Sequence, residues 1–196
     1  ILDIDHFAPM AAAEKLSVWE RRKPVKDEPA PAAVETGKRR GGKPVMGPRV
    51  IICAALSGAA TMKNPNPHVP YTPQEFAEEA YRCHQAGAAM VHVHSRLDNG
   101  FATHEIDRIR ETHDAIKQRC PEIIVNLSSA VGMGKTAEQR IAQIVEIKPE
   151  MASLNTNTMN FSIIDRKTGK IFIDYVFENT FTMLQDFGKA MEENGV

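Results

Sequence analysis

The chain has 196 residues and a formal net charge of −1, with 42% hydrophobic and 25% charged residues. This composition is ordinary for a globular protein with a core, and the near-zero charge excludes a global attraction to nucleic acid or to a membrane surface. The sequence contains no apolar run long enough to cross a bilayer and no recognisable secretory signal. Its three scattered cysteines favour reduced thiols, so we expect a cytoplasmic protein without nucleic-acid or membrane partners.

Residues 1–49 differ in composition from the rest of the chain. They are rich in proline, include an Ala/Pro stretch at 29–33 and carry clusters of charge. Such a segment has little apolar surface to bury, so we expect a partly disordered N-terminal extension whose only candidate element is a short helix over 11–22. The folded domain is expected over residues 50–196.

From residue 50 onward, short apolar runs alternate with helical patterns. Two segments, Thr72–Glu75 and Thr136–Gln139, place Glu or Gln three residues after a threonine, which is typical of a helix start. Runs rich in β-branched residues indicate strands, and apolar residues at three- and four-residue spacing indicate helices. In chain order we expect a strand at 50–56, a helix at 73–85, a strand at 88–94, a helix around 106–116, a strand at 123–128, a helix from 136, a strand at 151–155, a hairpin from strands at 161–164 and 171–176, and a last helix around 181–191.

Four strand-then-helix units in succession predict a parallel sheet in an α/β fold. A flavodoxin-like open sheet and a TIM-type (β/α)8 barrel both begin in this way, and both place their sites at the carboxyl ends of the strands. A complete barrel takes roughly 200–250 residues or more. About 147 residues follow the extension, which is too few for a complete barrel.

His92 and His94 are separated by one valine inside the expected strand at 88–94. Side chains alternate along a strand, so both imidazoles point the same way, about 6.6 Å apart along it. This spacing suits chelation of a transition metal such as zinc, for which imidazole is an ordinary ligand. The alternative is a pair of histidines satisfied in the core or at a sheet edge.

A catalytic zinc needs a third protein ligand, and the sequence offers no convincing one at the other strand ends. Those strands end in serine and asparagine, which are poor zinc ligands. His68, in a proline-rich loop, is a weak candidate. Either the pair is not a metal site, or its ligand set is completed by residues outside this chain.

Other polar and sulfur-containing residues are expected to have local roles. Cys53 and Cys83 have apolar neighbours and are expected in the core, whereas Cys120, just before a proline, is expected to be partly exposed. Arg96 follows the histidine pair by two residues, and it either binds a carboxylate or pairs with Asp98.

Several segments together resemble the β-keto acid cleavage enzymes, whose founding member is 3-keto-5-aminohexanoate cleavage enzyme. The resemblance runs over roughly 50–196, in order and at similar spacing. The segments are Ala54-Ala55-Leu56-Ser57-Gly58-Ala59, Pro70-Tyr71-Thr72-Pro73-Gln74-Glu75, Gln85-Ala86-Gly87-Ala88, Val91-His92-Val93-His94-Ser95-Arg96 and Lys148-Pro149-Glu150-Met151-Ala152-Ser153-Leu154-Asn155.

The resemblance implies a (β/α)8 barrel with zinc at its C-terminal mouth, of which this chain carries about the first four β/α units. It implies condensation of a β-keto acid with acetyl-CoA, giving acetoacetate and a new acyl-CoA. His92 and His94 match the family's zinc histidines, and Ser128, Ser153 and Asn155 match positions that contact the substrate. A family glutamate that binds the substrate amine corresponds to Ala60, which implies a β-keto acid without the amine.

The resemblance also implies that part of the site is missing from this chain. The family's third zinc ligand, a glutamate, lies beyond residue 196, together with the catalytic aspartate and arginine. We therefore expect the N-terminal half of such an enzyme, with weak zinc binding and almost no activity as an isolated chain.

Two other hypotheses stay open. A metal-dependent hydrolase of the amidohydrolase type also uses a His-x-His pair, but carries it on its first strand with further ligands on later strands. A non-catalytic half-barrel that needs a partner chain is the third hypothesis, because open strand edges and an exposed apolar face favour association. We expect a homo-oligomer.

Overall fold

The computed structural model describes residues 2–3, 50–64, 66–165 and 167–196. The expected extension over 1–49, with its candidate helix at 11–22, lies almost wholly outside the described residues. Both therefore stay predictions. Residues 52–196 belong to one compact unit, which carries every helix described below.

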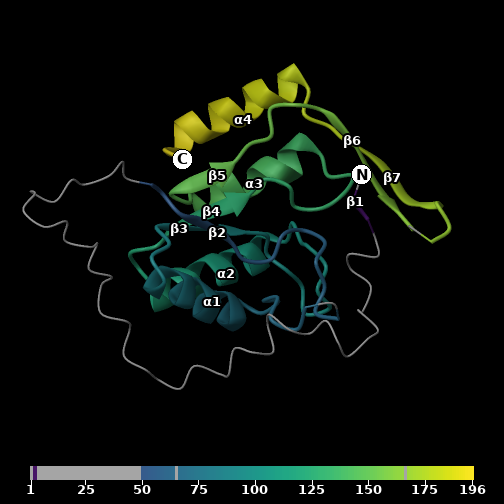
Figure 1. The fold of residues 1–196 in the computed structure, drawn as a ribbon. Coiled ribbons are helices and arrows are strands. Elements are labelled where there is room, and N and C mark those ends of the chain that lie inside the picture. The colour runs from purple at the N-terminus through teal and green to yellow at the C-terminus, as the bar shows by residue number, and fades with distance from the viewer. Residues whose placement is uncertain (1, 4–49, 65, 166) are drawn as a thin grey trace, which may run out of the picture. The chain divides into compact units, whose positions relative to one another are not determined.

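The unit is built on a parallel sheet of four strands in the order β2-β3-β4-β5. These strands are β2 (Cys53–Ala55), β3 (Met90–Val93), β4 (Ile124–Ser128) and β5 (Met151–Ser153), and Figure 1 shows them side by side. Consecutive order is typical of successive units of a (β/α) barrel, whereas a flavodoxin-like sheet places its first strand between later ones. The α/β fold and the parallel sheet are confirmed, and among the described residues the sheet stays open at β2 and β5.

Four helices follow the strands: α1 (Pro73–Gln85), α2 (Ile106–Arg119), α3 (Ala137–Ile147) and α4 (Phe181–Asn194). Both α1 and α3 begin with the expected capping box, in which the threonine side chain accepts from the N3 backbone and the N3 side chain accepts from the threonine backbone. Across the described parts of the chain, no helix is both long and apolar enough to cross a membrane.

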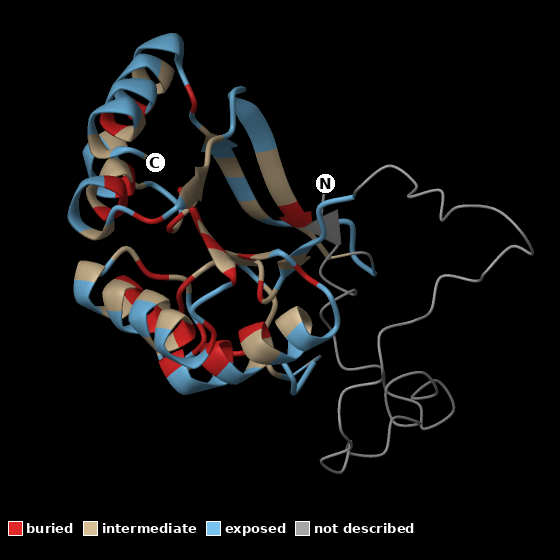
Figure 2. Ribbon diagram, turned by 90° about the vertical axis from the view of Figure 1, so that its left-hand side faces the viewer, coloured by how far each residue is buried: buried red, intermediate tan, exposed pale blue. Residues whose placement is uncertain are grey.

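All four helices pack on one face of the sheet. On β3 and β4, Val91 and Leu127 are buried against the first two helices, in a cluster that includes Ile116. Ala152 on β5 pairs with Leu127, so it shares their face, and it packs against the second cluster around Phe187. Figure 2 shows this buried layer between the strands and the helices. The opposite face of the sheet carries polar residues near the strand ends, and the apolar Met90, Ile124 and Met151 before them.

The structure corrects three expectations about burial. The run that starts at Val50 was expected to be a buried strand, but Val50 is 79% exposed, and only Cys53–Ala55 form the strand. Cys53 is exposed rather than in the core, because it pairs with Met90 and so lies on the face of the sheet opposite the helices. Cys120 is buried rather than partly exposed, because it caps α2 and joins the core cluster.

A hairpin separates β5 from α4. Its strands are β6 (Met159–Ile164) and β7 (Ile171–Phe177), slightly longer than expected, and they pair in antiparallel fashion. Asp165 shapes the turn, since its carboxylate accepts from the N–H of Lys167 at 2.8 Å. A two-residue strand, β1 (Leu2–Asp3), pairs with β6 in parallel and makes this a three-stranded sheet.

Candidate active site

The face of the sheet opposite the helices carries the polar residues that the sequence singled out. His92 on β3 pairs with Asn126 on β4, and Ser128 at the end of β4 pairs with Ser153 at the end of β5. Strand partners share a face, so these side chains form adjacent rows near the carboxyl ends of the strands. Asn155 lies two residues beyond β5 and is exposed.

His92 and His94 point toward each other. Their Nε2 atoms are 3.2 Å apart, and their rings meet edge to face at 84°. The Nδ1 atom of His94 lies 3.2 Å from the carbonyl oxygen of Ala130. A carbonyl oxygen only accepts, so Nδ1 of His94 carries the proton, and its unprotonated Nε2 faces Nε2 of His92. Hydrogen bonding of this kind commonly fixes the tautomer of a metal-binding histidine.

The geometry of the pair fits two positions of a zinc site. Two imidazole nitrogens bound to a tetrahedral zinc lie about 3.3 Å apart, given Zn–N bonds of about 2.0–2.1 Å. The separation of the two Nε2 atoms is 3.2 Å. Over the described residues there is no cluster of three His, Cys, Asp or Glu side chains that could hold a metal. The described residues thus offer two candidate ligands and no third one beside them.

Both histidines are kept neutral. Burial is the main cause that lowers the pKa of His94 to about 4, and the neighbouring His92 and Arg96 lower it further. Burial also lowers the pKa of His92, while the nearby Asn126 side chain acts in the opposite direction. The Asn126 Oδ1 atom is itself buried and makes no hydrogen bond of normal geometry with the described residues. A neutral imidazole is the form that binds a metal.

Arg96 has neither of its expected roles, because Asp98 pairs with Arg108 and the Arg96 guanidinium is fully buried. It donates to backbone carbonyl groups instead, and so joins the turn after β2 to the turn after β3. Its acceptors are the carbonyl oxygens of Ser57, Gly58, Thr61 and Gly100. Ser57 adds a second link, because its Oγ donates to the carbonyl oxygen of His94 at 3.2 Å.

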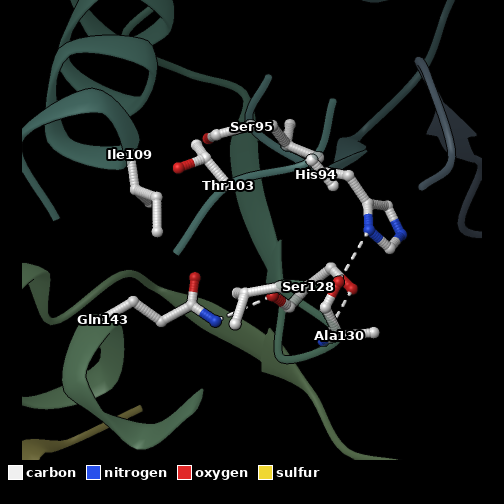
Figure 3. Close-up of a pocket in the computed structure, with 10 residues that line it drawn as sticks. His94, Ser95, Thr103, Ile109, Ser128, Ala130 and Gln143 are labelled. Atoms are coloured by element: carbon white, nitrogen blue, oxygen red, sulfur yellow. Dashed lines mark hydrogen bonds between the residues drawn. The ribbon is translucent and has the colours of Figure 1, made fainter. Parts of the chain in front are cut away.

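Ser128 is buried, and both its side chain and its backbone are held in place. Its Oγ accepts from the N–H of Ala130 at 3.2 Å, and its carbonyl oxygen accepts from Nε2 of Gln143 at 2.7 Å. Figure 3 shows these contacts around a small pocket, which His94 and Thr103 also line. Ser128, which is predicted to contact the substrate, therefore lies at the same pocket as His94.

Three polar residues around the site were not predicted from the sequence: Arg140, Gln143 and Asn179. All three are buried, and they bind the turns that follow β4 and β5. The one available signal was the position of Arg140 and Gln143 on the inward face of the amphipathic helix α3. That signal does not say which backbone groups the side chains reach.

The sequence from Arg49 to the end of the chain matches a known protein family. A model of the beta-keto acid cleavage enzyme family matches residues 49–196. The chain belongs to the beta-keto acid cleavage enzymes. This confirms the family expected from the sequence segments around the histidine pair.

Curated members of the beta-keto acid cleavage enzymes are clearly similar to this chain. The 3-keto-5-aminohexanoate cleavage enzyme of Acetoanaerobium sticklandii is 41% identical over 148 residues, which cover 76% of this chain and 50% of the relative. The 3-dehydrocarnitine:acetyl-CoA trimethylamine transferase of Rhizobium meliloti is 32% identical over 171 residues, covering 77% and 54%. The chain thus spans about half the length of these relatives. Both relatives are named as enzymes, so by resemblance this is an enzyme.

A solved structure supports the fold. The binary complex of ObcA with oxaloacetate aligns with a TM-score of 0.52 at 23% identity, covering 66% of this chain and 30% of that chain. At this identity the likeness concerns the arrangement of strands and helices.

Proposed function

We propose that this protein is a zinc-dependent beta-keto acid cleavage enzyme that joins a β-keto acid and acetyl-CoA to give acetoacetate and a new acyl-CoA. The observation that carries the proposal is the convergence of the two Nε2 atoms, 3.2 Å apart, at the strand ends of a chain of this family. Relatives named as acetyl-CoA transferases support the co-substrate.

In this proposal, His92 and His94 hold the zinc ion through Nε2. Zinc in this position supplies a Lewis acid for the keto oxygen of the substrate. The protein keeps both rings neutral by burial and keeps the His94 ring oriented through Ala130. Because the His94 ring is already oriented before the ion binds, less conformational entropy is lost on binding.

Ser128, Ser153 and Asn155 are proposed to orient the carboxylate and keto groups of the substrate by hydrogen bonds. The pairing of Ser128 with Ser153 supports a shared binding surface next to the histidines. Among the described residues, the strand ends carry no carboxylate that could act as the base. The proposal assigns that role, together with the third zinc ligand and an arginine, to family residues expected beyond position 196.

The substrate is proposed to be a β-keto acid without an amino group. Ala60, which lies in the turn after β2 and is exposed, occupies the position at which the resemblance implies an amine-binding glutamate. The methyl side chain of Ala60 carries no charge that could pair with an ammonium group. A substrate whose side chain is uncharged or anionic therefore fits this position better.

We also propose that the protein acts in the cytoplasm as a homo-oligomer. The edges of β2 and β5, which are open among the described residues, support association, because unpaired strand edges bind other chains. A mass of 21.7 kDa in solution, that of a single chain, would count against this part of the proposal.

Zinc titration tests the proposed site directly. Competition against a chromophoric chelator is measured for the wild type, for His92→Ala and His94→Ala, and for His84→Ala on α1 as a matched control. We expect loss of binding only in the first two variants. Equal affinities in all four proteins would refute the metal site. Acyl-CoA formation from acetyl-CoA and a panel of β-keto acids tests the reaction, with almost no turnover expected from the chain of 196 residues.

A further inference from the structure

Arg140 on α3 is a buried cation whose contacts reach toward the candidate site. It is 2% exposed, and its guanidinium lies 4.8 Å from the centre of the Phe177 ring and 5.0 Å from that of Phe187. All its described acceptors are neutral: the carbonyl oxygens of Ser129 and of Glu178 and the side-chain oxygen of Asn179. A buried charge with neutral partners is costly for stability, so an apolar side chain would serve the core better.

On one side, Arg140 acts through Asn179. The guanidinium donates to Oδ1 of Asn179 at 2.7 Å. Asn179 in turn donates from Nδ2 to the carbonyl oxygen of Asn157 and from its backbone N–H to Oγ1 of Thr158, both at 2.9 Å. Those two residues lie two and three positions after Asn155, in the connection after β5. Arg140 therefore holds the segment that carries a proposed substrate residue.

On the other side, Arg140 holds the turn after β4. Its Nε donates to the carbonyl oxygen of Ser129 at 3.0 Å, and the next residue, Ala130, provides the carbonyl oxygen that orients His94. One helical turn along α3, Gln143 fixes the carbonyl oxygen of Ser128, as Figure 3 shows. A continuous set of hydrogen bonds and peptide links thus connects the loop after β5 to the histidine ring.

We propose that Arg140 is a positioning residue that holds the turn after β4 and the connection after β5 in one arrangement, so that Ala130 keeps His94 in its metal-binding tautomer. The inference rests on the proposed function of the strand ends. Arg140 does not contact the reacting atoms in this scheme. It acts on them through the backbone of Ser129 and Ala130 and through Asn179.

The test compares three variants. Arg140→Met removes the donors but retains the apolar contact with the aromatic rings, and Arg140→Lys keeps the charge but cannot serve three separated acceptors. Ile144→Ala, on the same helix and fully buried in a cluster with Phe187, lowers stability without removing a hydrogen bond to either turn. Nitrogen-15 spectra of the imidazole groups, recorded without metal, report the tautomer of His94. Zinc affinity is measured alongside, and unfolding temperature controls for general destabilisation.

We expect the wild type and Ile144→Ala to show the Nδ1–H tautomer of His94, and Arg140→Met to show a mixture with an affinity for zinc reduced about tenfold. If Arg140→Met does not fold, the test rests on Arg140→Lys. For this variant we expect a smaller fraction of the other His94 tautomer and a smaller loss of zinc affinity than for Arg140→Met. The proposal is overturned if the arginine variants retain the wild-type tautomer, or if Ile144→Ala perturbs it equally. The tautomer is read without metal, so a wild type that binds no zinc would refute the metal site and leave this test intact.

Discussion

Nδ1 of His94 lies 3.2 Å from the carbonyl oxygen of Ala130, and this contact determines which nitrogen of the ring is free. His94 belongs to the end of one strand and Ala130 to the turn after the next, so the orientation of the ring depends on how two neighbouring units pack.

Acidification is expected to destabilise the metal-free protein through His94. Burial holds the pKa of His94 at about 4 in the folded state, below its value of 6.5 in an unfolded chain, so the unfolded state binds more protons between these values. Stability therefore falls as the pH drops from 6.5 toward 4, by at most about 3 kcal/mol. Urea unfolding at pH 7.5 and 4.5 measures the effect. His94→Asn should show a smaller pH dependence than the wild type, and an unchanged dependence would contradict the assignment.

Loss of the Arg96 side chain is expected to unfold the turns after β2 and β3. Arg96→Met leaves four carbonyl groups without their donor, two of them on the buried residues Ser57 and Gly100, for a cost of about 3 kcal/mol or more. Arg119, whose guanidinium pairs with Glu78 at the surface, provides the control. Arg119→Met should leave the free energy of unfolding close to that of the wild type. Similar losses in both variants would show that burial of Arg96 does not matter.

The elements of the fold were predictable because their signals are local. Thr72 and Thr136 are each followed three positions later by Glu or Gln, a pattern that predicts the start of a helix. Both capping boxes are present in the structure, as expected. The carboxyl ends of parallel strands meet at one edge of a sheet, so polar residues after each strand could be grouped without knowledge of the register. The family resemblance supplied the roles proposed for them.

What could not be predicted depends on contacts between distant segments. Nothing near Arg140 in the sequence indicates that it reaches Asn179, 39 residues away. The exposure of Val50 and Cys53 depends on where the strand begins and on which face of it the helices pack, and an apolar run alone indicates neither. Neither role expected for Arg96, binding a carboxylate or pairing with Asp98, was correct. Its acceptors are backbone carbonyl groups, which every residue carries and which the sequence therefore does not mark.

Removal of the first helix cap should cost a modest amount of stability. Thr72→Ala loses the side-chain acceptor for the N–H of Glu75, which lies at 3.2 Å, and we expect a loss of about 1 kcal/mol. Thr72→Ser retains the acceptor and should stay close to the wild type. Chemical denaturation of the three proteins measures the difference. Equal stability of the alanine and serine variants would show that the cap contributes nothing.

Gly100 is expected to tolerate no side chain. Its φ is +88°, and a methyl group at this position would overlap the ring of Tyr71, which is buried. Gly169 has a φ of +69° and open space around it, so Gly169→Ala carries only backbone strain of about 1–2 kcal/mol. Gly100→Ala should be clearly less stable than Gly169→Ala in thermal unfolding. Equal unfolding temperatures of the two alanine variants would argue against close packing of Tyr71 on Gly100.

The hydrogen bond from the N–H of Asn179 to Oγ1 of Thr158, 2.9 Å long, closes the base of the β6–β7 hairpin. Both ends of the hairpin are therefore anchored independently of what lies between them. The entropy needed to close a longer loop grows only slowly with its length. This arm is where the chain can gain or lose residues, or accept a fluorescent or affinity label, while the strand ends beside it keep their spacing.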